Sequence, residues 1–432
     1  MNFLESEAYL VSLGNEVSAM KLGLENIRTL LAALGEPQNK YLKVQVAGTN
    51  GKGSVCAFLD SICNTAGIKT GTFTSPHLVS ITERIRINGE DISEEDFARH
   101  AILVRVTAEN LLANGELEYR PTFFEQITAI ALVAFAEAKI EVAILETGLG
   151  GRLDATTAAN AEIAAITRID LDHQEYLGET LAEIAAEKAA IIDGFGVIDV
   201  VIGKQEPRSL GVILEKCAAN SIEPVTGDDS LDWTLRKGAT SGFAKLDTSL
   251  ISFDEFQLGL KGAHQFENAK TAVSISQVLH YGYIHLPGEA VLEGLQSARH
   301  PGRLEYVGKY LFDGAHNIGG ANALAEYLRE FETRPITLVF GAMRDKNVAE
   351  ILSVLIPLAD RIVLTEPSNS RSLAYEELLV QMPSNISKEK TFATNNVANA
   401  INIANEITQD EGIILVTGSL YLVGDVKKIL NN

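Results

Sequence analysis

The chain has 432 residues, of which 46% are hydrophobic and 22% are charged, and its formal net charge at pH 7 is −21. Since single hydrophobic cores stop growing near ~250–300 residues, this length predicts two domains in a soluble globular protein. The negative charge disfavours nucleic acid as the main partner, because its phosphates would be repelled, although a local cluster of Lys and Arg could still bind an anionic substrate.

Composition also indicates where the protein works. Cys56, Cys63 and Cys217 have no C-x-x-C spacing and stand among apolar residues, which is typical of buried free thiols in a reducing compartment. The first residues are acidic and lack the pattern of a signal peptide, and no apolar run approaches the ~20 residues of a membrane span. We therefore expect a cytoplasmic protein with no membrane partner.

The first third of the chain leads into a glycine-rich loop. Residues 5–13 and 24–34 are predicted helices, and residues 43–47 are typical of a buried strand. The sequence Gly-Thr-Asn-Gly-Lys-Gly-Ser at 48–54 then predicts a turn, with a helix that begins at Ser54.

The features of this loop are suited to binding phosphate. A helix N-terminus behind a glycine turn presents free N–H groups and partial positive charge, Lys52 adds a full charge, and the Ser54 hydroxyl can ligate Mg²⁺. The loop departs from G-x-x-x-x-G-K-[ST] because Gly53 separates Lys52 from Ser54. The alternative is a glycine turn with one solvated lysine.

A second predicted strand, residues 68–74, ends in Thr74-Ser-Pro-His-Leu78. Hydroxyls and an imidazole beside a phosphate loop are candidates for metal or substrate contact, whereas the alternative is a Ser-Pro turn with a surface histidine. We expect a small hairpin over residues 83–89 and a helix over 93–114. The helix at 122–135 begins with a capping box of Thr122 and Glu125, and a structural role alone could account for both.

Residues 142–146 form an apolar strand that ends in the carboxylate of Glu146 and then glycines. In nucleotide enzymes such a carboxylate usually holds Mg²⁺; the alternative is a helix cap or a salt bridge. Another strand at 163–167 precedes His173, which favours a metal site if the strands lie side by side. Lys188 lies on the apolar helix at 180–191, where its amine either extends along the helix to solvent or has a specific functional role.

The remaining pattern predicts the second domain. Residues 231–258 suggest hairpins on a sheet edge, and a helix runs from 261 to 279 with Asn268 in its first turn, as a cap or a contact to a base. Pro301 and Gly302 mark a boundary, after which strands at 310–313, 336–340, 361–365 and 413–416 alternate with helices. We expect domains at 1–298 and 299–432.

Together these segments resemble the folylpolyglutamate synthase/dihydrofolate synthase family of the Mur-ligase superfamily over essentially the whole chain. The resemblance is carried by eight segments, which are Ala47–Ser54, Thr74–Leu78, Thr122–Glu125, Glu146–Thr156, Leu171–Gly178, His300–Arg303, Phe312–Asn317 and Thr417–Tyr421. It implies an α/β fold, with a P-loop-containing Mur-ligase-like central domain and a smaller Rossmann-like C-terminal domain.

The resemblance also implies roles for individual residues. ATP would be bound by Thr49, Asn50, Gly51, Lys52, Gly53, Ser54, Asn268, Arg303 and Asp313. Mg²⁺, with two sites expected, would be held by Ser75, Glu146 and His173, with Ser54 as a further hydroxyl. Lys52, Lys188 and His316 would be catalytic, with Lys188 matching a lysine that is carbamylated in the superfamily. The pterin substrate would contact Lys21, Leu22, Gly23, Leu24, Thr122, Phe123, Phe124, Glu125, Leu153, Asp154 and Ala155.

The implied reaction joins L-glutamate to dihydropteroate or a reduced folate. A substrate carboxylate attacks the γ-phosphate of ATP, and the glutamate amine then displaces phosphate from the acyl phosphate to form an amide. Charge develops on oxygens that Mg²⁺, Lys52 and the helix N-terminus would stabilise, so no protein nucleophile is needed. We expect the cleft to close during the reaction, and we expect a monomer.

Two alternative functions lie outside this family, and a third question concerns which reactions a family member catalyses. A cell-wall ligase would carry a UDP-binding domain, for which the 47 residues before Gly48 leave no room. A GTPase switch would show Asp-x-x-Gly and Asn-Lys-x-Asp motifs, and neither Asp170-Leu-Asp-His nor Thr167-Arg-Ile-Asp qualifies. Within the family, Ser75-Pro-His77 and Gly151–Asp154 resemble bifunctional members more than enzymes limited to polyglutamylation. Thr157 stands where the family usually has Asn, which leaves details of that substrate loop open.

Overall fold

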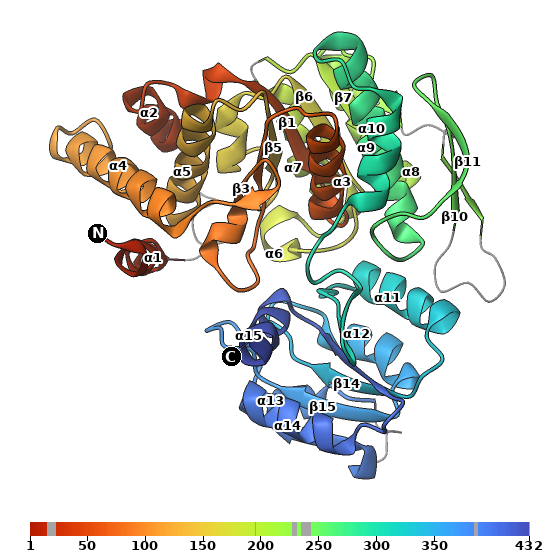
Figure 1. Cartoon of the computed structure of the whole chain (residues 1–432). Coiled ribbons are helices and arrows are strands. Elements are labelled where there is room, and N and C mark those ends of the chain that lie inside the picture. The colour runs from red at the N-terminus through yellow and green to blue at the C-terminus, as the bar shows by residue number, and fades with distance from the viewer. Residues whose placement is uncertain (15–22, 195, 227–230, 235–242, 384–387, 432) are drawn as a thin grey trace.

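The computed structural model describes the chain except for residues 15–22, 195, 227–230, 235–242, 384–387 and 432. Its described elements form two lobes, each built on a mostly parallel sheet with helices on both faces (Figure 1). We call the part up to the end of α10 the first lobe and the part from β12 onward the second lobe. The α/β fold class predicted from the sequence is confirmed.

The first lobe contains an eight-stranded sheet in the order β4-β3-β2-β5-β1-β6-β7-β8. The strands β2, β5, β1, β6, β7 and β8 are parallel to one another. At one edge, β3 and β4 are antiparallel and form the predicted hairpin. The strands are β1 (Leu42–Ala47), β2 (Thr70–Phe73), β3 (Ile85–Ile87), β4 (Glu90–Asp91), β5 (Val142–Glu146), β6 (Ile163–Ile166), β7 (Asp199–Ile202) and β8 (Val225–Thr226).

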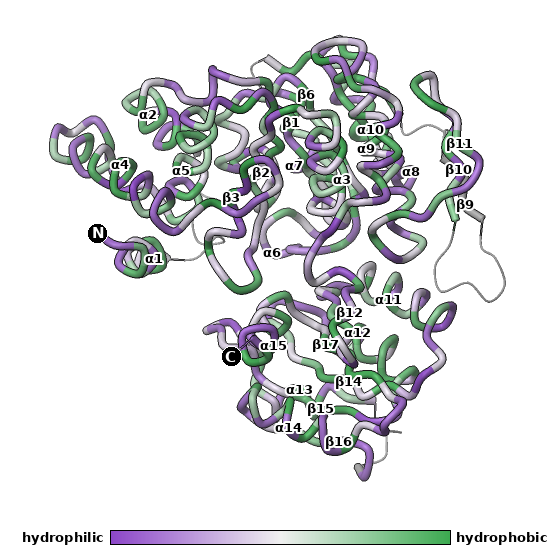
Figure 2. Tube along the Cα trace, in the orientation of Figure 1, coloured by the Kyte–Doolittle hydropathy of each residue, from purple (hydrophilic) through white to green (hydrophobic). Residues whose placement is uncertain are grey.

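Helices cover both faces of this sheet, so that its central strands are buried on both sides. One face packs against α1 (Phe3–Ser12), α2 (Glu25–Ala33), α4 (Glu94–Ala113), α5 (Phe123–Ala138), α7 (Leu181–Ala189) and α8 (Pro207–Ala219). The other packs against α3 (Lys52–Thr65), α9 (His264–Gly282) and α10 (Gly288–Ser297). Figure 2 shows hydrophobic residues concentrated along the strands and the helix faces turned toward them. The short helix α6 (Gln174–Leu177) follows β6.

Three strands pair with one another beside α9. They are β9 (Leu231–Thr234), β10 (Phe243–Asp247) and β11 (Ser252–Phe256), and they are antiparallel. The predicted hairpins therefore exist, but the expectation of a sheet edge was wrong because these strands form a sheet of their own. Ala244, Leu246 and Phe256 are buried and pack this small sheet against a hydrophobic core that also contains residues of α9.

The second lobe contains a six-stranded sheet in the order β12-β13-β17-β14-β15-β16, parallel except for β12. Its strands are β12 (Glu305–Val307), β13 (Tyr310–Phe312), β14 (Ile336–Phe340), β15 (Arg361–Thr365), β16 (Thr391–Thr394) and β17 (Ile413–Thr417). α11 (Ile318–Phe331), α12 (Val348–Leu355) and α13 (Tyr375–Val380) cover one face, and α14 (Val397–Ile407) and α15 (Leu420–Asn431) the other. The predicted boundary at 298/299 falls between α10 and β12.

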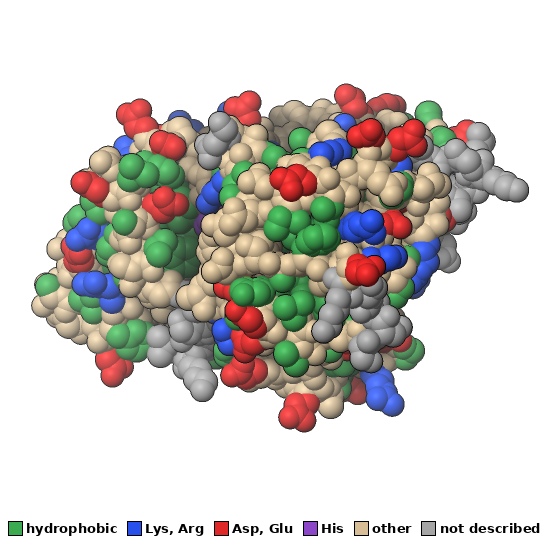
Figure 3. Space-filling view, turned by 90° about the horizontal axis from the view of Figure 1, so that it is seen from below, with side chains coloured by type: hydrophobic (Ala, Val, Ile, Leu, Met, Phe, Trp, Pro, Cys, Tyr) green, Lys and Arg blue, Asp and Glu red, His purple; other side chains and the backbone are tan. Residues whose placement is uncertain are grey.

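Several local expectations can be compared directly. The three cysteines are buried and unbridged, as predicted. In the described part of the chain, no helix has both the length and the apolar character that crossing a membrane requires. On the face seen in Figure 3, acidic and basic side chains are interspersed over the surface.

The helix that carries the phosphate loop is held by a close helix–helix contact. Gly294 of α10 lies against the backbone of Ile62 in α3, where an added Cβ atom would be closer than van der Waals contact. We expect Gly294→Ala to lower the free energy of unfolding by about 1–3 kcal/mol, because the two helices would have to move apart. Denaturant unfolding of the whole chain measures it.

Gly211→Ala in α8 is the matched control. Apart from its chain neighbours and the backbone of its own helix, no atom lies within 4 Å of the position that a Cβ atom would take at this glycine. Helix propensity alone therefore predicts a gain of up to about 1 kcal/mol. Equal effects of the two substitutions would contradict the packing argument.

Candidate functional site

The carboxyl ends of three adjacent parallel strands form the floor of the site. β1 lies between β5 and β6, so the residues that follow these strands meet at one edge of the sheet. A cavity of about 680 Å³ opens at this edge and is lined by both lobes. All predicted ATP-binding, metal-binding and catalytic residues line it: Thr49, Asn50, Gly51, Lys52, Gly53, Ser54, Ser75, Glu146, His173, Lys188, Asn268, Arg303, Asp313 and His316.

The glycine loop is held by its neighbours as much as by its own turn. The backbone N–H groups of Thr49 and Asn50 both donate to the carbonyl oxygen of Arg168, at 2.9 and 3.1 Å. Gly51, with φ of 95°, is the N-cap of α3, so the helix begins at Lys52 and not at Ser54 as predicted. Lys52, Gly53 and Ser54 therefore occupy the first turn, whose N–H groups have no intrahelical acceptor.

Asn268 approaches this loop from α9. A Cβ atom on Gly51 would collide with the Asn268 side-chain oxygen, so glycine is required both by its φ and by this close approach. The Asn268 amide donates to Gln265 at 2.9 Å. Asn268 lies in the second turn of α9, which begins at His264, so the predicted first-turn position was wrong.

Glu146 ends β5 and is 6% exposed. The backbone N–H of Ser75 donates to its Oε2 atom at 3.2 Å, which joins the ends of β5 and β2. The residues that supply the predicted carboxylate and the predicted hydroxyl are thus neighbours, on the wall of the large cavity that the first lobe supplies.

His173 follows β6 and is half-buried. Burial lowers its pKa to about 3, and the charges of Lys346, His316 and Lys188 act in the same direction although Asp172 opposes them. The imidazole is therefore neutral, and among the described residues its buried Nδ1 atom has no hydrogen-bond partner. A neutral imidazole with such a nitrogen is a suitable metal ligand. In the described part of the chain, however, no group of three or more His, Cys, Asp or Glu side chains is arranged so that it could hold a metal ion.

Lys188 is buried beneath the glycine loop. Its ammonium donates to the Gly48 carbonyl oxygen at 2.8 Å. Burial lowers its pKa to about 7, and the charge of Lys52 contributes further. Near neutral pH a large share of this side chain is therefore an uncharged amine.

From the second lobe, Asp313 and His316 reach the same cavity. The Asp313 carboxylate accepts hydrogen bonds from the backbone of Leu304 and Ala315, at 3.0 and 2.9 Å, and burial raises its pKa although Arg303 opposes this. The Nδ1 atom of His316 lies 2.8 Å from the Gly314 carbonyl oxygen, and its Nε2 atom lies 3.5 Å from Asp172.

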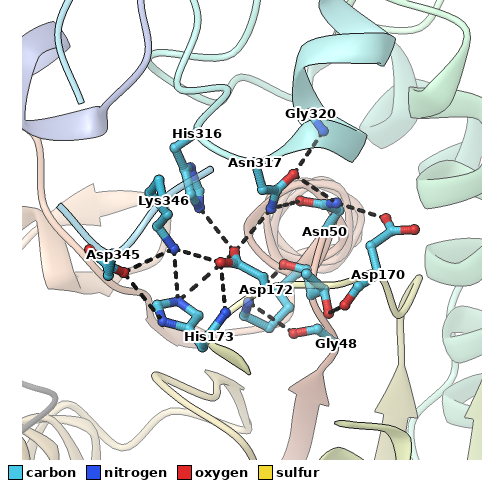
Figure 4. Close-up of polar contacts among 12 residues, drawn as sticks. Gly48, Asn50, Asp170, Asp172, His173, His316, Asn317, Gly320, Asp345 and Lys346 are labelled. Carbon is cyan, nitrogen blue, oxygen red and sulfur yellow. Dashed lines mark hydrogen bonds and ion pairs between the residues drawn. The ribbon is translucent and has the colours of Figure 1, made fainter. Parts of the chain in front are cut away.

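The structure adds residues that sequence reasoning missed. Asp172, Asn317 and Lys346 meet between the lobes (Figure 4). Burial alone would raise the pKa of Asp172, but the His316 hydrogen bond and the Lys346 charge bring it well below its ordinary value. Asp172 and Asn317 lie inside motifs already singled out, whereas no pattern pointed to Lys346. Arg371 lines the same cavity.

A second, small cavity of about 30 Å³ gathers the predicted substrate residues. It is lined by Gly23, Leu24, Thr122, Phe124, Glu125, Leu153, Asp154 and Ala155. Gly148 and Leu149 line both this cavity and the large one. Of the other predicted substrate residues, Phe123 packs under the guanidinium of Arg84, 5.2 Å from its ring centre, and Lys21 and Leu22 lie outside the described residues.

Some substrate-loop residues also have clear structural roles. Thr122 and Glu125 form the predicted capping box of α5. Asp154 accepts the backbone N–H groups of Gly148 and Leu149, both at 2.9 Å, and so shapes the loop between the cavities. The Thr157 hydroxyl donates to Gly151 O at 2.8 Å, which keeps this loop closed without an amide side chain.

Comparison with known families covers most of the chain. Residues 46–276 match the Mur ligase middle domain, and residues 303–430 match the dihydrofolate synthetase C-terminal domain. The chain is 34% identical to the dihydrofolate synthase/folylpolyglutamate synthase of Bacillus subtilis, over 95% of each chain. It is 33% identical to the protein of that name from Mycobacterium tuberculosis, over 94% of this chain and 89% of the relative.

Solved structures agree. Folylpolyglutamate synthase of Mycobacterium tuberculosis complexed with ADP superposes with a TM-score of 0.89 at 31% identity, over 100% and 98% of the two chains. Escherichia coli FolC in complex with DHPP and ADP has a TM-score of 0.84 at 28% identity, over 99% and 97%. A bifunctional folylpolyglutamate synthase/dihydrofolate synthase with Mn, AMPPNP and L-glutamate bound has a TM-score of 0.83 at 28% identity, over 100% and 98%. This chain therefore belongs to the dihydrofolate synthase/folylpolyglutamate synthase family of Mur-type ligases.

Proposed function

We propose that this protein is an ATP-dependent ligase that joins L-glutamate to dihydropteroate, giving dihydrofolate, and to tetrahydrofolate, giving polyglutamates. The observation that carries the proposal is the meeting of two cavities at Gly148 and Leu149. One contains the phosphate loop and the other the predicted pterin contacts. A carboxylate on a substrate in the second cavity would point to the phosphate loop in the first.

The ligands in related structures support each substrate. ADP, DHPP and L-glutamate are bound in relatives that cover nearly the whole of this chain. The residue roles expected from the sequence are retained here as proposals: residues 49–54, Asn268, Arg303 and Asp313 for ATP, and the residues around the small cavity for the pterin.

Lys52 and the first turn of α3 would stabilise charge on the transferred phosphoryl group, because both present positive charge at the end of β1. His316 would act on the same group from the second lobe. Lys52 is already held at the loop, since its ammonium donates to the carbonyl oxygens of Gly48 and Thr49, at 3.1 and 3.3 Å.

A divalent metal fits the donor set. Mg²⁺ prefers one or two protein carboxylates together with phosphate and water oxygens, which suits a site with one buried carboxylate, hydroxyls and a neutral histidine. Ser54, Ser75, Glu146 and His173 would hold it, in two sites as we expect. When bound, the metal neutralises charge on the phosphates.

Organisation and location follow as parts of the proposal. One chain supplies both walls of the large cavity, which supports a monomer with domains at 1–298 and 299–432. Buried free thiols and an ATP co-substrate support a cytoplasmic location.

The test is phosphate release from ATP that depends on Mg²⁺ and L-glutamate, with dihydropteroate and tetrahydrofolate supplied separately. We expect activity with both. Activity with tetrahydrofolate alone would leave a folylpolyglutamate synthase, and no activity with either would overturn the proposal.

Lys52→Ala is the inactive control for this assay. We expect turnover to fall by about 100-fold or more, because a charge at the phosphoryl group is lost, while circular dichroism stays unchanged. Turnover near that of the wild-type protein would contradict the role of the loop.

Arg371 is the side chain we expect to receive a carboxylate of L-glutamate. It lines the large cavity from the second lobe, donates to the Tyr421 hydroxyl at 3.4 Å, and forms no ion pair within the described residues. Arg371→Ala should raise KM for L-glutamate about 10- to 100-fold, the effect of losing a charged hydrogen bond. KM for ATP should change less than about twofold, because the phosphate loop is untouched.

Arg361→Ala is the matched control, because Arg361 begins β15 and Arg371 follows its end. It should leave both KM values unchanged. Equal rises in KM for ATP and L-glutamate after Arg371→Ala would show a general distortion of the lobe and contradict the assignment.

Carbamylation of Lys188 is the last part of the proposal. Carbon dioxide adds to an uncharged amine, and the Lys188 pKa of about 7 makes that form abundant. In ¹³C NMR with labelled bicarbonate, the carbamate signal should grow as the pH rises through about 7 and fade below it. Lys188→Ala should remove the signal and Lys204→Ala, at an exposed lysine, should retain it; loss in both would refute the site.

A further inference from the structure

Several polar side chains make contacts between the lobes, beside the apolar packing of Leu78 against the second lobe. We call them the interlobe cluster: Asn50, Asp172, His316, Asn317 and Lys346 (Figure 4). Asn50 and Asp172 come from loops of the first lobe, after β1 and β6. His316, Asn317 and Lys346 come from the second lobe, before α11 and after β14.

Asp172 receives donors from both lobes. Its Oδ1 atom accepts the Lys346 ammonium at 2.6 Å and the His173 backbone N–H at 2.9 Å. Its Oδ2 atom accepts the Asn317 amide at 3.0 Å. The Asp172 and Lys346 side chains are each only 7% exposed. Opening the lobes would take the buried Asp172 carboxylate away from the Lys346 ammonium, which opposes opening, although Lys346 would keep Asp345 of its own lobe at 3.4 Å.

Asn50 and Asn317 form a reciprocal amide pair. Asn317 donates to the Asn50 oxygen at 3.0 Å, and Asn50 donates back at 3.3 Å. The Asn50 amide also donates to Asp170 at 2.8 Å. The Asn317 oxygen also caps α11, accepting the Gly320 N–H at 2.8 Å. The phosphate loop is thus joined directly to the first turn of a second-lobe helix.

We propose that Asn317, with Asp172 and Lys346, is a positioning group that holds the lobes closed while the acyl phosphate exists. The inference rests on the proposed function. In the productive step the glutamate amine attacks the acyl carbon, the C–O bond to phosphate breaks, and the amine loses a proton. If water attacks instead, the products are the original carboxylate and inorganic phosphate, and ATP is consumed without an amide.

The test is the ratio of ADP released to amide formed at saturating substrates. The wild-type protein should give about one ADP per amide, as the stoichiometry of the coupled reaction requires. Asn317→Ser keeps a good helix cap but removes the bridging amide. We expect its ratio to rise to about three or more, because water reaches the intermediate when the lobes separate. A purely structural role for Asn317 would lower both products together and leave the ratio at one.

Asn396→Ser is the matched control, since Asn396 caps α14 in the same way, accepting the Asn399 N–H at 3.0 Å, on the exposed surface. It should leave the ratio unchanged, and a rise there equal to that of Asn317→Ser would overturn the proposal. Lys346→Met, which removes another second-lobe donor to Asp172, should also raise the ratio. This variant tests the proposal if Asn317→Ser does not fold. In the double variant the rise should be less than the product of the single effects, because both donors act on one carboxylate.

An unchanged ratio in both single variants would overturn the inference while leaving the ligase activity established. Absence of any amide from the wild-type protein would instead overturn the proposed function, so the two failures are distinguishable.

Discussion

The parallel pairing of β1 between β5 and β6 is the constraint on which the site depends. Because parallel strands end at the same edge, this register brings the glycine loop, Glu146 and His173 together although they are distant in sequence. The loop is then held by the Arg168 carbonyl, which accepts two of its N–H groups. Any shift of β6 against β1 would move the loop and the histidine apart.

Local charge in the cavity is less acidic than the charge of the whole chain. The net charge is −21, yet the cavity lining has as many Lys and Arg as Asp and Glu residues, with Lys52, Arg303 and Arg371 among the basic ones. Burial decides this contrast, because charges at contact distance in a cleft are weakly screened whereas acidic groups on the surface act through water. An acidic protein can therefore bind a polyphosphate and two carboxylate substrates.

Several residues combine a structural and a proposed functional role. Glu125 caps α5 and lines the small cavity, and Asp154 holds the loop that joins the two cavities. The structural explanation that the sequence offered for Glu125 is therefore correct and does not compete with the functional one. Asn317 likewise caps α11 and also joins the lobes.

The sequence by itself determined the α/β class and most strand ends, because apolar runs, glycine turns and caps are local signals, whereas the residues expected in the cavity came mostly from the resemblance to a family. It placed Ser54 at the start of α3 and Asn268 in the first turn of α9, both displaced by a few residues, since helix ends depend on caps that periodicity does not show. It also missed Lys346 and the pairing of Asn50 with Asn317. Only the tertiary structure decided those contacts, because they join residues 174 and 267 positions apart, whose approach depends on how two separately packed lobes meet.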